Sequence, residues 1–201
     1  MSKMKRAKWP SPDLTELENE LARDDETNRS DRVKRLKFVR EEFGNPTDML
    51  LVGGIPAGFA IYEMAHSYVV GDFMATVLLA QVFVEHSLGG SFIMSGDDDT
   101  ATGGFSKLIS QSLSKGLIPN ALAEKLHKLR KMRNPYSHPN PGLTPRSYVG
   151  RMMEKKVYSP EDLAEQDARF ALEIVVDFLR HGSPNWHPKN DDSPSTEERA
   201  V

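Results

Sequence analysis

Hydrophobic residues recur along this chain at the spacing that is typical of amphipathic α-helices. Apolar side chains follow one another at intervals of three and four over Ile55 to Val70. The run from Phe73 to Leu88 is apolar on nearly all sides, which indicates a helix buried inside a bundle. Shorter helices are predicted over Phe105 to Ser114 and from Asn120 to about Arg133. No convincing strand pattern occurs, so we predict an all-α bundle of about four to five core helices.

The ends of several predicted helices are marked by capping residues or by helix breakers. The last helix begins at Ser159 as the N-cap, with Pro160 in the first helical position, and runs to Arg180. The pair Gly89-Gly90 is expected to close the all-apolar helix. Pro135 is expected to end the helix before it, because proline lacks the N–H that a further turn needs.

The charge pattern divides the chain into three parts. Residues 1–47 are interpreted as a charged N-terminal helical arm, in which the polar segment DDETNRSD separates one helix from a second at Asp31 to Phe43. Residues 48–182 hold most of the apolar side chains and form the predicted helical domain. Residues 183–201 are polar and rich in proline, which is typical of a disordered C-terminal tail.

Composition restricts the function without assigning it. The 201 residues include no cysteine, which excludes disulfides, thiolate nucleophiles and zinc ribbons and favours a cytoplasmic location. No run approaches the roughly 18 consecutive apolar residues of a membrane span, and no signal peptide is visible, so no membrane association is predicted. The formal net charge of −3 lacks the overall basic character of a nucleic-acid binder. Any basic surface must therefore be local.

Several segments carry polar residues without predicting chemistry. The segment Val52–Gly58 (VGGIPAG) lacks the Gly-Lys-Ser/Thr ending of a phosphate-binding loop and is interpreted as a loop before a helix. The acidic run Asp97–Asp99 is interpreted as a solvated turn. His66 and His86 are interpreted as core or interface residues of helices. No metal site and no cofactor are predicted.

One helix carries an arginine where its buried face should continue. Leu122, Leu126 and Leu129 lie at positions i, i+4 and i+7 of this helix. Position i+11 is Arg133, which returns to within about 20° of Leu122 around the helix axis. An unpaired buried charge is costly, so Arg133 is expected either to be paired or to take part in the function. Asn134 follows it directly.

The segment after Arg133 resembles the hallmark motif of the HEPN superfamily. That motif is an arginine, a polar residue that is often asparagine, and a histidine after four to six intervening residues. Arg133, Asn134 and His138 match it within LHKLRKMRNPYSHPN, and Glu85 near the end of an apolar helix matches a second family feature. The resemblance covers roughly Ile55 to Arg180 and implies a HEPN-like helical bundle.

A second arginine and histidine also fit the bare spacing of this motif. Arg180 and His187 are separated by six residues, but no asparagine follows Arg180 and His187 falls in the predicted tail. We therefore interpret this second match as a coincidence.

The resemblance implies RNA cleavage without a metal ion. His138 would act as base or acid, Arg133 would hold the phosphate, and Asn134 would orient the phosphate or fix the tautomer of His138. The products would be a 2′,3′-cyclic phosphate and a 5′-OH end. The resemblance further implies a homodimer whose two motifs face each other, and a toxin or defence role with a cognate antitoxin protein.

Basic residues around the motif are candidates for binding the RNA backbone. The candidate substrate-binding residues are Arg130, Lys131, Lys128 and Tyr136, with Lys125 on the same local basic face. The alternative is a non-catalytic HEPN-like module that dimerises, binds a partner protein or binds a nucleotide. In that case Arg133 would form a structural ion pair with Glu85, and His138 would be a loop residue.

Overall fold

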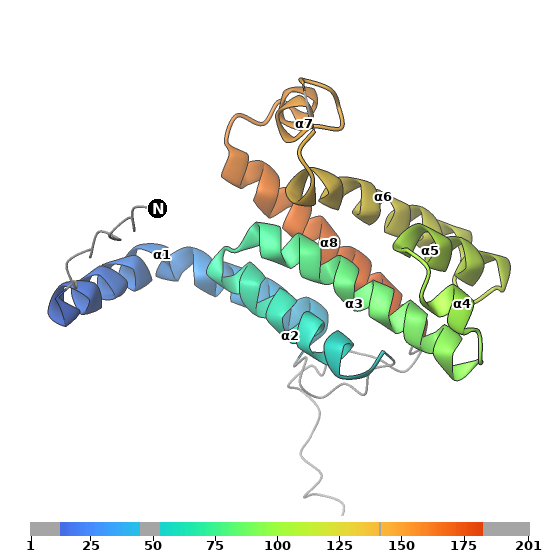
Figure 1. The fold of residues 1–201 in the computed structure, drawn as a ribbon. Helices are drawn as coiled ribbons and strands as arrows, with labels where there is room; N and C mark the ends of the chain where they lie inside the picture. Colours follow the sequence, from blue (N-terminus) through green and yellow to red (C-terminus); the bar gives the residue numbers. More distant parts are fainter. Residues whose placement is uncertain (1–12, 45–52, 141, 183–201) are drawn as a thin grey trace, which may run out of the picture.

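The computed structural model describes residues 13–44, 53–140 and 142–182, and every regular element in these ranges is an α-helix. The prediction of an all-α fold is confirmed. The helices of the described ranges are α1 (Leu14–Phe43), α2 (Gly54–Val70), α3 (Phe73–Met94), α4 (Asp98–Ala101), α5 (Phe105–Ser114), α6 (Asn120–Ser137), α7 (Tyr148–Lys155) and α8 (Pro160–Gly182). Figure 1 shows their arrangement. The predicted C-terminal tail, with His187, lies outside the described residues.

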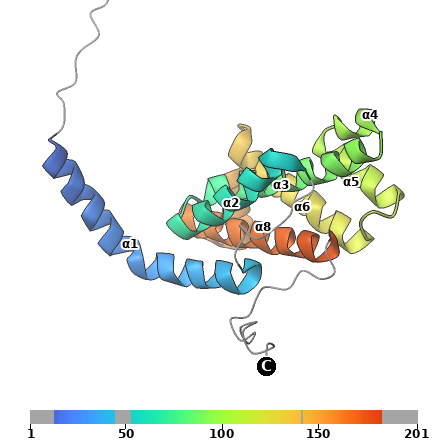
Figure 2. The same ribbon diagram turned by 90° about the horizontal axis from the view of Figure 1, so that it is seen from below.

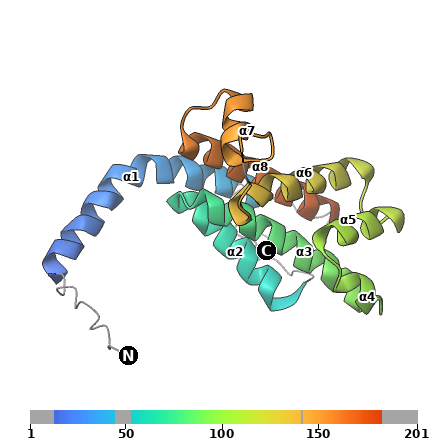
Figure 3. The same ribbon diagram turned by 45° about the horizontal axis from the view of Figure 1, so that its top comes forward.

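Helix α3 is the central element of the bundle. It packs along α2 and α8 and also contacts α4, α5 and α6 (Figures 1 and 3). Its Phe83 is 1% exposed and meets Phe178 of α8 edge to face, with ring centroids 6.0 Å apart. Within the described ranges, α3 alone is long and apolar enough to cross a membrane, and half of its most apolar window is buried in the bundle. Burial on many sides accounts for the all-apolar pattern of this helix.

Helix α1 is one continuous helix, so the predicted break at DDETNRSD is wrong. The segment contains neither glycine nor proline, and its polar side chains bond within the helix. Asn28 donates to the carbonyl oxygen of Asp24 at 3.1 Å, and Arg32 pairs with Asp25. The first half of α1 projects from the body and the second half packs on it, as Figure 2 shows. Phe43, which is 1% exposed, anchors the packed half.

Two glycines allow close approaches between helices. The pair Gly89-Gly90 does not close α3, which continues to Met94, contrary to the prediction. A Cβ at Gly89 would lie 3.3 Å from the carbonyl oxygen of Ala101, so the missing side chain lets α4 approach. Gly53 precedes α2 with φ of 114°, and a Cβ there would lie 2.9 Å from the backbone of His86. Packing therefore explains a glycine inside α3 and the close contact made by the glycine that caps α2.

Helix α6 continues through Pro135 and ends at Ser137, so the predicted end before Pro135 is wrong. Proline removes one backbone hydrogen bond, and here only a short last turn follows it. The chain leaves the helix at His138, whose φ of −136° and ψ of 135° are extended. Arg133 and Asn134 therefore lie on the last turns of a helix, and His138 lies just beyond its end.

The remaining helices agree with the pattern except for two short ones. Helix α5 has the predicted bounds, and α8 begins at Pro160 as predicted. Helices α4 and α7 were not predicted, since each is short and follows a segment rich in polar residues, glycine or proline. Ser147 caps α7 by accepting a 3.0 Å hydrogen bond from the backbone N–H of Gly150.

Candidate functional site

Arg133, Asn134 and His138 line one cleft between α3, α5 and α6. Its volume is about 530 Å³. Helices α3, α5 and α6 contact one another, and α3 runs below α6 in Figure 1. The cleft is lined by Gln81 and Glu85 of α3, Gly104, Phe105, Ser106 and Lys107 at the start of α5, and Arg130, Arg133, Asn134 and His138.

The guanidinium of Arg133 contacts the imidazole of His138 directly. Nη1 of Arg133 lies 3.2 Å from Nε2 of His138 and donates a 2.7 Å hydrogen bond to the hydroxyl of Ser137. Arginine can only donate, so a hydrogen bond in this contact requires Nε2 of His138 to be the acceptor. The two motif residues thus share one solvent-reachable cleft, because the chain turns out of the helix between them.

A glutamine holds Arg133 from the opposite side. Nε of Arg133 donates a 2.9 Å hydrogen bond to Oε1 of Gln81, which is 4% exposed. Nε2 of Gln81 in turn donates to Oε2 of Glu85 at 3.2 Å. In the described part of the chain, Gln81 bridges Arg133 and Glu85 in place of the predicted direct ion pair. A neutral amide can donate and accept at once, which lets it link a cation to an anion.

Asn134 contacts His138 through its backbone. The carbonyl oxygen of Asn134 accepts a 2.9 Å hydrogen bond from the N–H of His138. The imidazole ring is held by Arg133 and not by the Asn134 side chain, in the contacts that the described residues make. Asn134 also lines the cleft.

Tyr136 lies within the motif, but its hydroxyl is hydrogen-bonded to a buried carboxylate. Its hydroxyl donates a 2.9 Å hydrogen bond to Oδ2 of Asp167, which is 1% exposed. Burial and the neighbouring Asp167 charge raise the pKa of Tyr136 far above its ordinary value. Both guanidinium ends of Arg151 donate to the same carboxylate at 2.6 Å. This position favours a structural role for Tyr136, which links the motif to α8, over the predicted contact with substrate.

The structure separates the predicted basic residues into different surroundings. Arg130 lines the cleft, and its Nε is buried without a hydrogen-bond partner among the described residues. Lys128 and Lys131 are exposed and lie outside the cleft lining. Lys125 forms an ion pair at 2.5 Å with Asp177 of α8. Lys107 of α5 joins the cleft from a distant part of the sequence.

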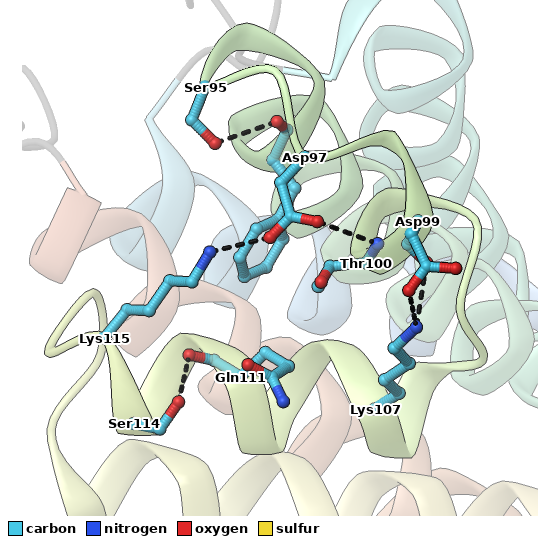
Figure 4. Close-up of polar contacts among 9 residues, drawn as sticks. Ser95, Asp97, Asp99, Thr100, Lys107, Gln111, Ser114 and Lys115 are labelled. Carbon is cyan, nitrogen blue, oxygen red and sulfur yellow. Dashed lines mark hydrogen bonds and ion pairs between the residues drawn. The ribbon is translucent and has the colours of Figure 1, made fainter.

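The acidic segment before α5 is tied to lysines at the two ends of that helix (Figure 4). Asp97 accepts a 3.1 Å hydrogen bond from the N–H of Thr100 and pairs with Lys115 at 2.7 Å. These contacts lower the pKa of Asp97 to about 2, chiefly through Lys115. Asp99 pairs with Lys107 at 2.8 Å. No group of three or more histidines and acids converges within the described ranges, and each of these two acids has a lysine as its partner.

Sequence reasoning missed Gln81 and Ser137, which contact Arg133, and the lining residues Gly104 to Lys107 at the start of α5. Gln81 could have been found as the polar residue inside the apolar run of α3, four positions before Glu85. Ser137 lies inside the motif, but no pattern distinguishes it. Lys107 carries no signal at all, because its place at the cleft depends on how α5 packs against α6.

Comparisons of this chain with models of protein families, with curated proteins and with solved structures found no match. The resemblance to the HEPN superfamily therefore rests on the residues of this chain alone.

Proposed function

We propose that the protein is a metal-independent endoribonuclease of the HEPN type. The observation that carries this proposal is the contact between Arg133 and His138, 3.2 Å apart in a cleft that is open to solvent. RNA supplies its own nucleophile, the 2′-OH. The protein must then supply proton transfer and stabilisation of negative charge on the phosphate.

Arg133 has the chemistry and position to bind the scissile phosphate. A guanidinium donates two parallel hydrogen bonds to a phosphate and favours the more negative transition state. Binding of phosphate to Nη1 would displace the ring of His138, and the nearby negative charge would favour the protonated imidazole. Attack by the 2′-OH would leave a 2′,3′-cyclic phosphate and a 5′-OH end. Arg130 adds positive charge beside the phosphate, and Lys107 lies in the same lining, where it pairs with Asp99.

The proposal is tested by incubating end-labelled RNA with the purified protein in the presence of EDTA. We expect cleavage to cyclic-phosphate and 5′-OH products, and we expect Arg133→Ala and His138→Ala to abolish it. Matched controls are Arg146→Ala, on an exposed side chain, and His127→Ala, earlier on α6, since neither residue lines the cleft. Absence of cleavage, or cleavage that survives in both motif variants, would exclude the nuclease.

A second candidate function is a non-catalytic module that forms dimers or binds a partner. It is favoured by apolar side chains that remain exposed on two packed helices. These are Ile55, Phe59 and Tyr62 of α2 and Val82, Ile93 and Met94 of α3. A groove of about 900 Å³ lined by Val82, Ile93 and Met94 also includes Glu85, so it adjoins the cleft.

We propose that this face binds a second copy of the chain, in the nuclease or in the alternative module. Light scattering coupled to gel filtration should then report a dimer, and Ile93→Lys should shift it to monomer. Val33→Lys, on an equally exposed side chain of α1, is the matched control. A wild-type protein that is monomeric at micromolar concentration would contradict the dimer.

The toxin or defence role is part of the same proposal. We expect expression in growing cells to slow growth and His138→Ala to relieve the effect. A cognate antitoxin would be recovered as a protein that protects cells from the wild-type chain. Equal growth inhibition by wild type and His138→Ala would contradict a toxin role based on RNA cleavage.

A further inference from the structure

The cleft contains a second acid–base group besides His138. Cleavage by the 2′-OH needs one group to accept the proton of the nucleophile and another to protonate the 5′ leaving oxygen. One imidazole in one protonation state cannot do both in the same transition state. Glu85 lines the cleft together with His138 and is the only carboxylate in its lining among the described residues.

The carboxylate of Glu85 is held in a fixed relation to the phosphate-binding guanidinium. Gln81 is nearly fully buried, and its amide contacts Glu85 at 3.2 Å and Arg133 at 2.9 Å. Both hydrogen bonds come from the Gln81 side chain on α3, so the rotamer of Gln81 fixes the position of Glu85 relative to Arg133. The partner of Glu85 in this contact is a neutral amide and not a cation, which leaves the carboxylate able to accept a proton.

The two groups differ in the role that they take at neutral pH. Carboxylates are deprotonated under these conditions and enter a reaction as bases. An imidazole next to a bound phosphate anion favours its protonated form and enters as an acid. The contact of Arg133 with Nε2 of His138 would give way once RNA is bound, since both groups would then face the phosphate.

We infer that Glu85 is the general base and His138 the general acid of the cleft. The inference rests on the proposed ribonuclease function and assigns both proton transfers to one protomer. Glu85 takes the proton of the 2′-OH as the O2′–P bond forms. The P–O5′ bond breaks while His138 gives its proton to O5′, and exchange with water restores both groups.

The first test is the pH dependence of RNA cleavage. We expect a bell-shaped profile for the wild type, with the acidic limb due to Glu85 and the alkaline limb due to His138. Glu85→Gln should lose the acidic limb and about 10²–10⁴-fold in kcat, with KM little changed. Glu85→Asp should recover part of the rate. Glu124→Gln, on an exposed residue of α6, is the matched control and should keep the wild-type profile.

The second test separates the base from the acid. In uridine 3′-(4-nitrophenyl phosphate) the leaving group departs without protonation, so the acid becomes dispensable while the base does not. His138→Ala should therefore lose much less activity on this substrate than on RNA. Glu85→Gln should lose the same factor on both.

The outcomes distinguish this inference from the function on which it rests. If Glu85→Gln folds and cleaves RNA at the wild-type rate, or is slower but keeps the acidic limb, Glu85 is not the base and the ribonuclease proposal stands. Folding of each variant is checked by its thermal transition. If the wild type cleaves no RNA, the proposed function fails and this inference fails with it.

Discussion

The hydroxyl of Tyr136 donates a 2.9 Å hydrogen bond to Oδ2 of Asp167, which ties the turn between Arg133 and His138 to helix α8. Arg151 of α7 binds the same carboxylate with two hydrogen bonds of 2.6 Å. The last turn of α6, which follows Pro135, is thus held in place by a buried network that includes residues of α7 and α8. The conformation of the six-residue motif from Arg133 to His138 therefore depends on contacts with α7 and α8.

Loss of the Asp167 carboxylate should strongly destabilise the fold. Asp167→Ala removes the acceptor of Tyr136 and leaves Arg151, whose side chain is 13% exposed, without its counter-ion. Breaking such a buried pair costs about 3–5 kcal/mol, measurable by urea unfolding. Asp177→Ala is the matched control. Its pair with Lys125 is 36% and 45% exposed, so a loss below about 1 kcal/mol is expected. Similar losses in the two variants would contradict the network's role.

The stability of the protein should fall at alkaline pH because of Tyr136. Its pKa is raised above the ordinary value of 10.0, so the folded state favours the neutral phenol. The stabilisation is complete below pH 10, where the phenol is neutral in both states, and is lost as the pH rises above that value. Tyr136→Phe should weaken this alkaline dependence and cost about 1–3 kcal/mol at neutral pH, because Asp167 loses a donor. Identical pH profiles for the two proteins would argue against this assignment.

Asp97 should contribute to stability in the opposite pH range. Its pKa is lowered from 3.8 to about 2, so its contribution is complete above pH 3.8 and is lost as the pH falls towards 2. Asp97→Asn should lower the melting temperature at pH 6 and flatten its decline between pH 4 and pH 2. Asp98→Asn is a control from the same segment. If the melting temperature of Asp97→Asn fell more steeply with acid than that of wild type, the predicted direction of this pH dependence would be wrong.

The two halves of α1 should respond differently to truncation of apolar side chains. Phe43 is 1% exposed, and Phe43→Ala should cost about 3–5 kcal/mol through loss of burial and a cavity. Leu21 is 68% exposed on the projecting half, and Leu21→Ala should change the free energy of unfolding by less than about 0.5 kcal/mol. Urea unfolding of both variants measures the contrast. A large loss in Leu21→Ala would show that the projecting half packs on something in solution.

RNA affinity should depend on Arg130 more than on the neighbouring lysine. Arg130 lines the cleft, whereas Lys128 is exposed outside its lining. Arg130→Ala should weaken binding to a non-cleavable 2′-deoxy oligonucleotide and reduce the slope of log K against log salt by about 1. Lys128→Ala should leave the slope unchanged. Fluorescence anisotropy at several salt concentrations gives both values, and equal slopes for the two variants would contradict a cleft-centred phosphate site.

The positions of the main helices could be predicted from local pattern, whereas Arg133, Asn134 and His138 were grouped as a motif by their resemblance to a known family. Leu122, Leu126 and Leu129 show the buried face of α6, and helical geometry alone places Arg133 on the same face, towards the interior. The predicted end of α6 before Pro135 was wrong. Helix propensity accounts for the hydrogen bond that proline removes, but it does not include the tertiary contact of Tyr136 with Asp167. The predicted break at DDETNRSD was also wrong, because side-chain contacts within α1 offset the weak helix propensity of these residues.

What surrounds Arg133 was decided by packing between distant segments. Gln81 lies 52 positions before Arg133, and Lys107 reaches the cleft only because α5 packs beside α6. Helical periodicity depends on residues three or four positions apart, so the sequence alone was sufficient to place the long apolar helices α2, α3 and α8 and most of α6. The partner of a buried charged side chain depends on which face of a neighbouring helix packs against it. The choice of that face follows from the packing of the whole core.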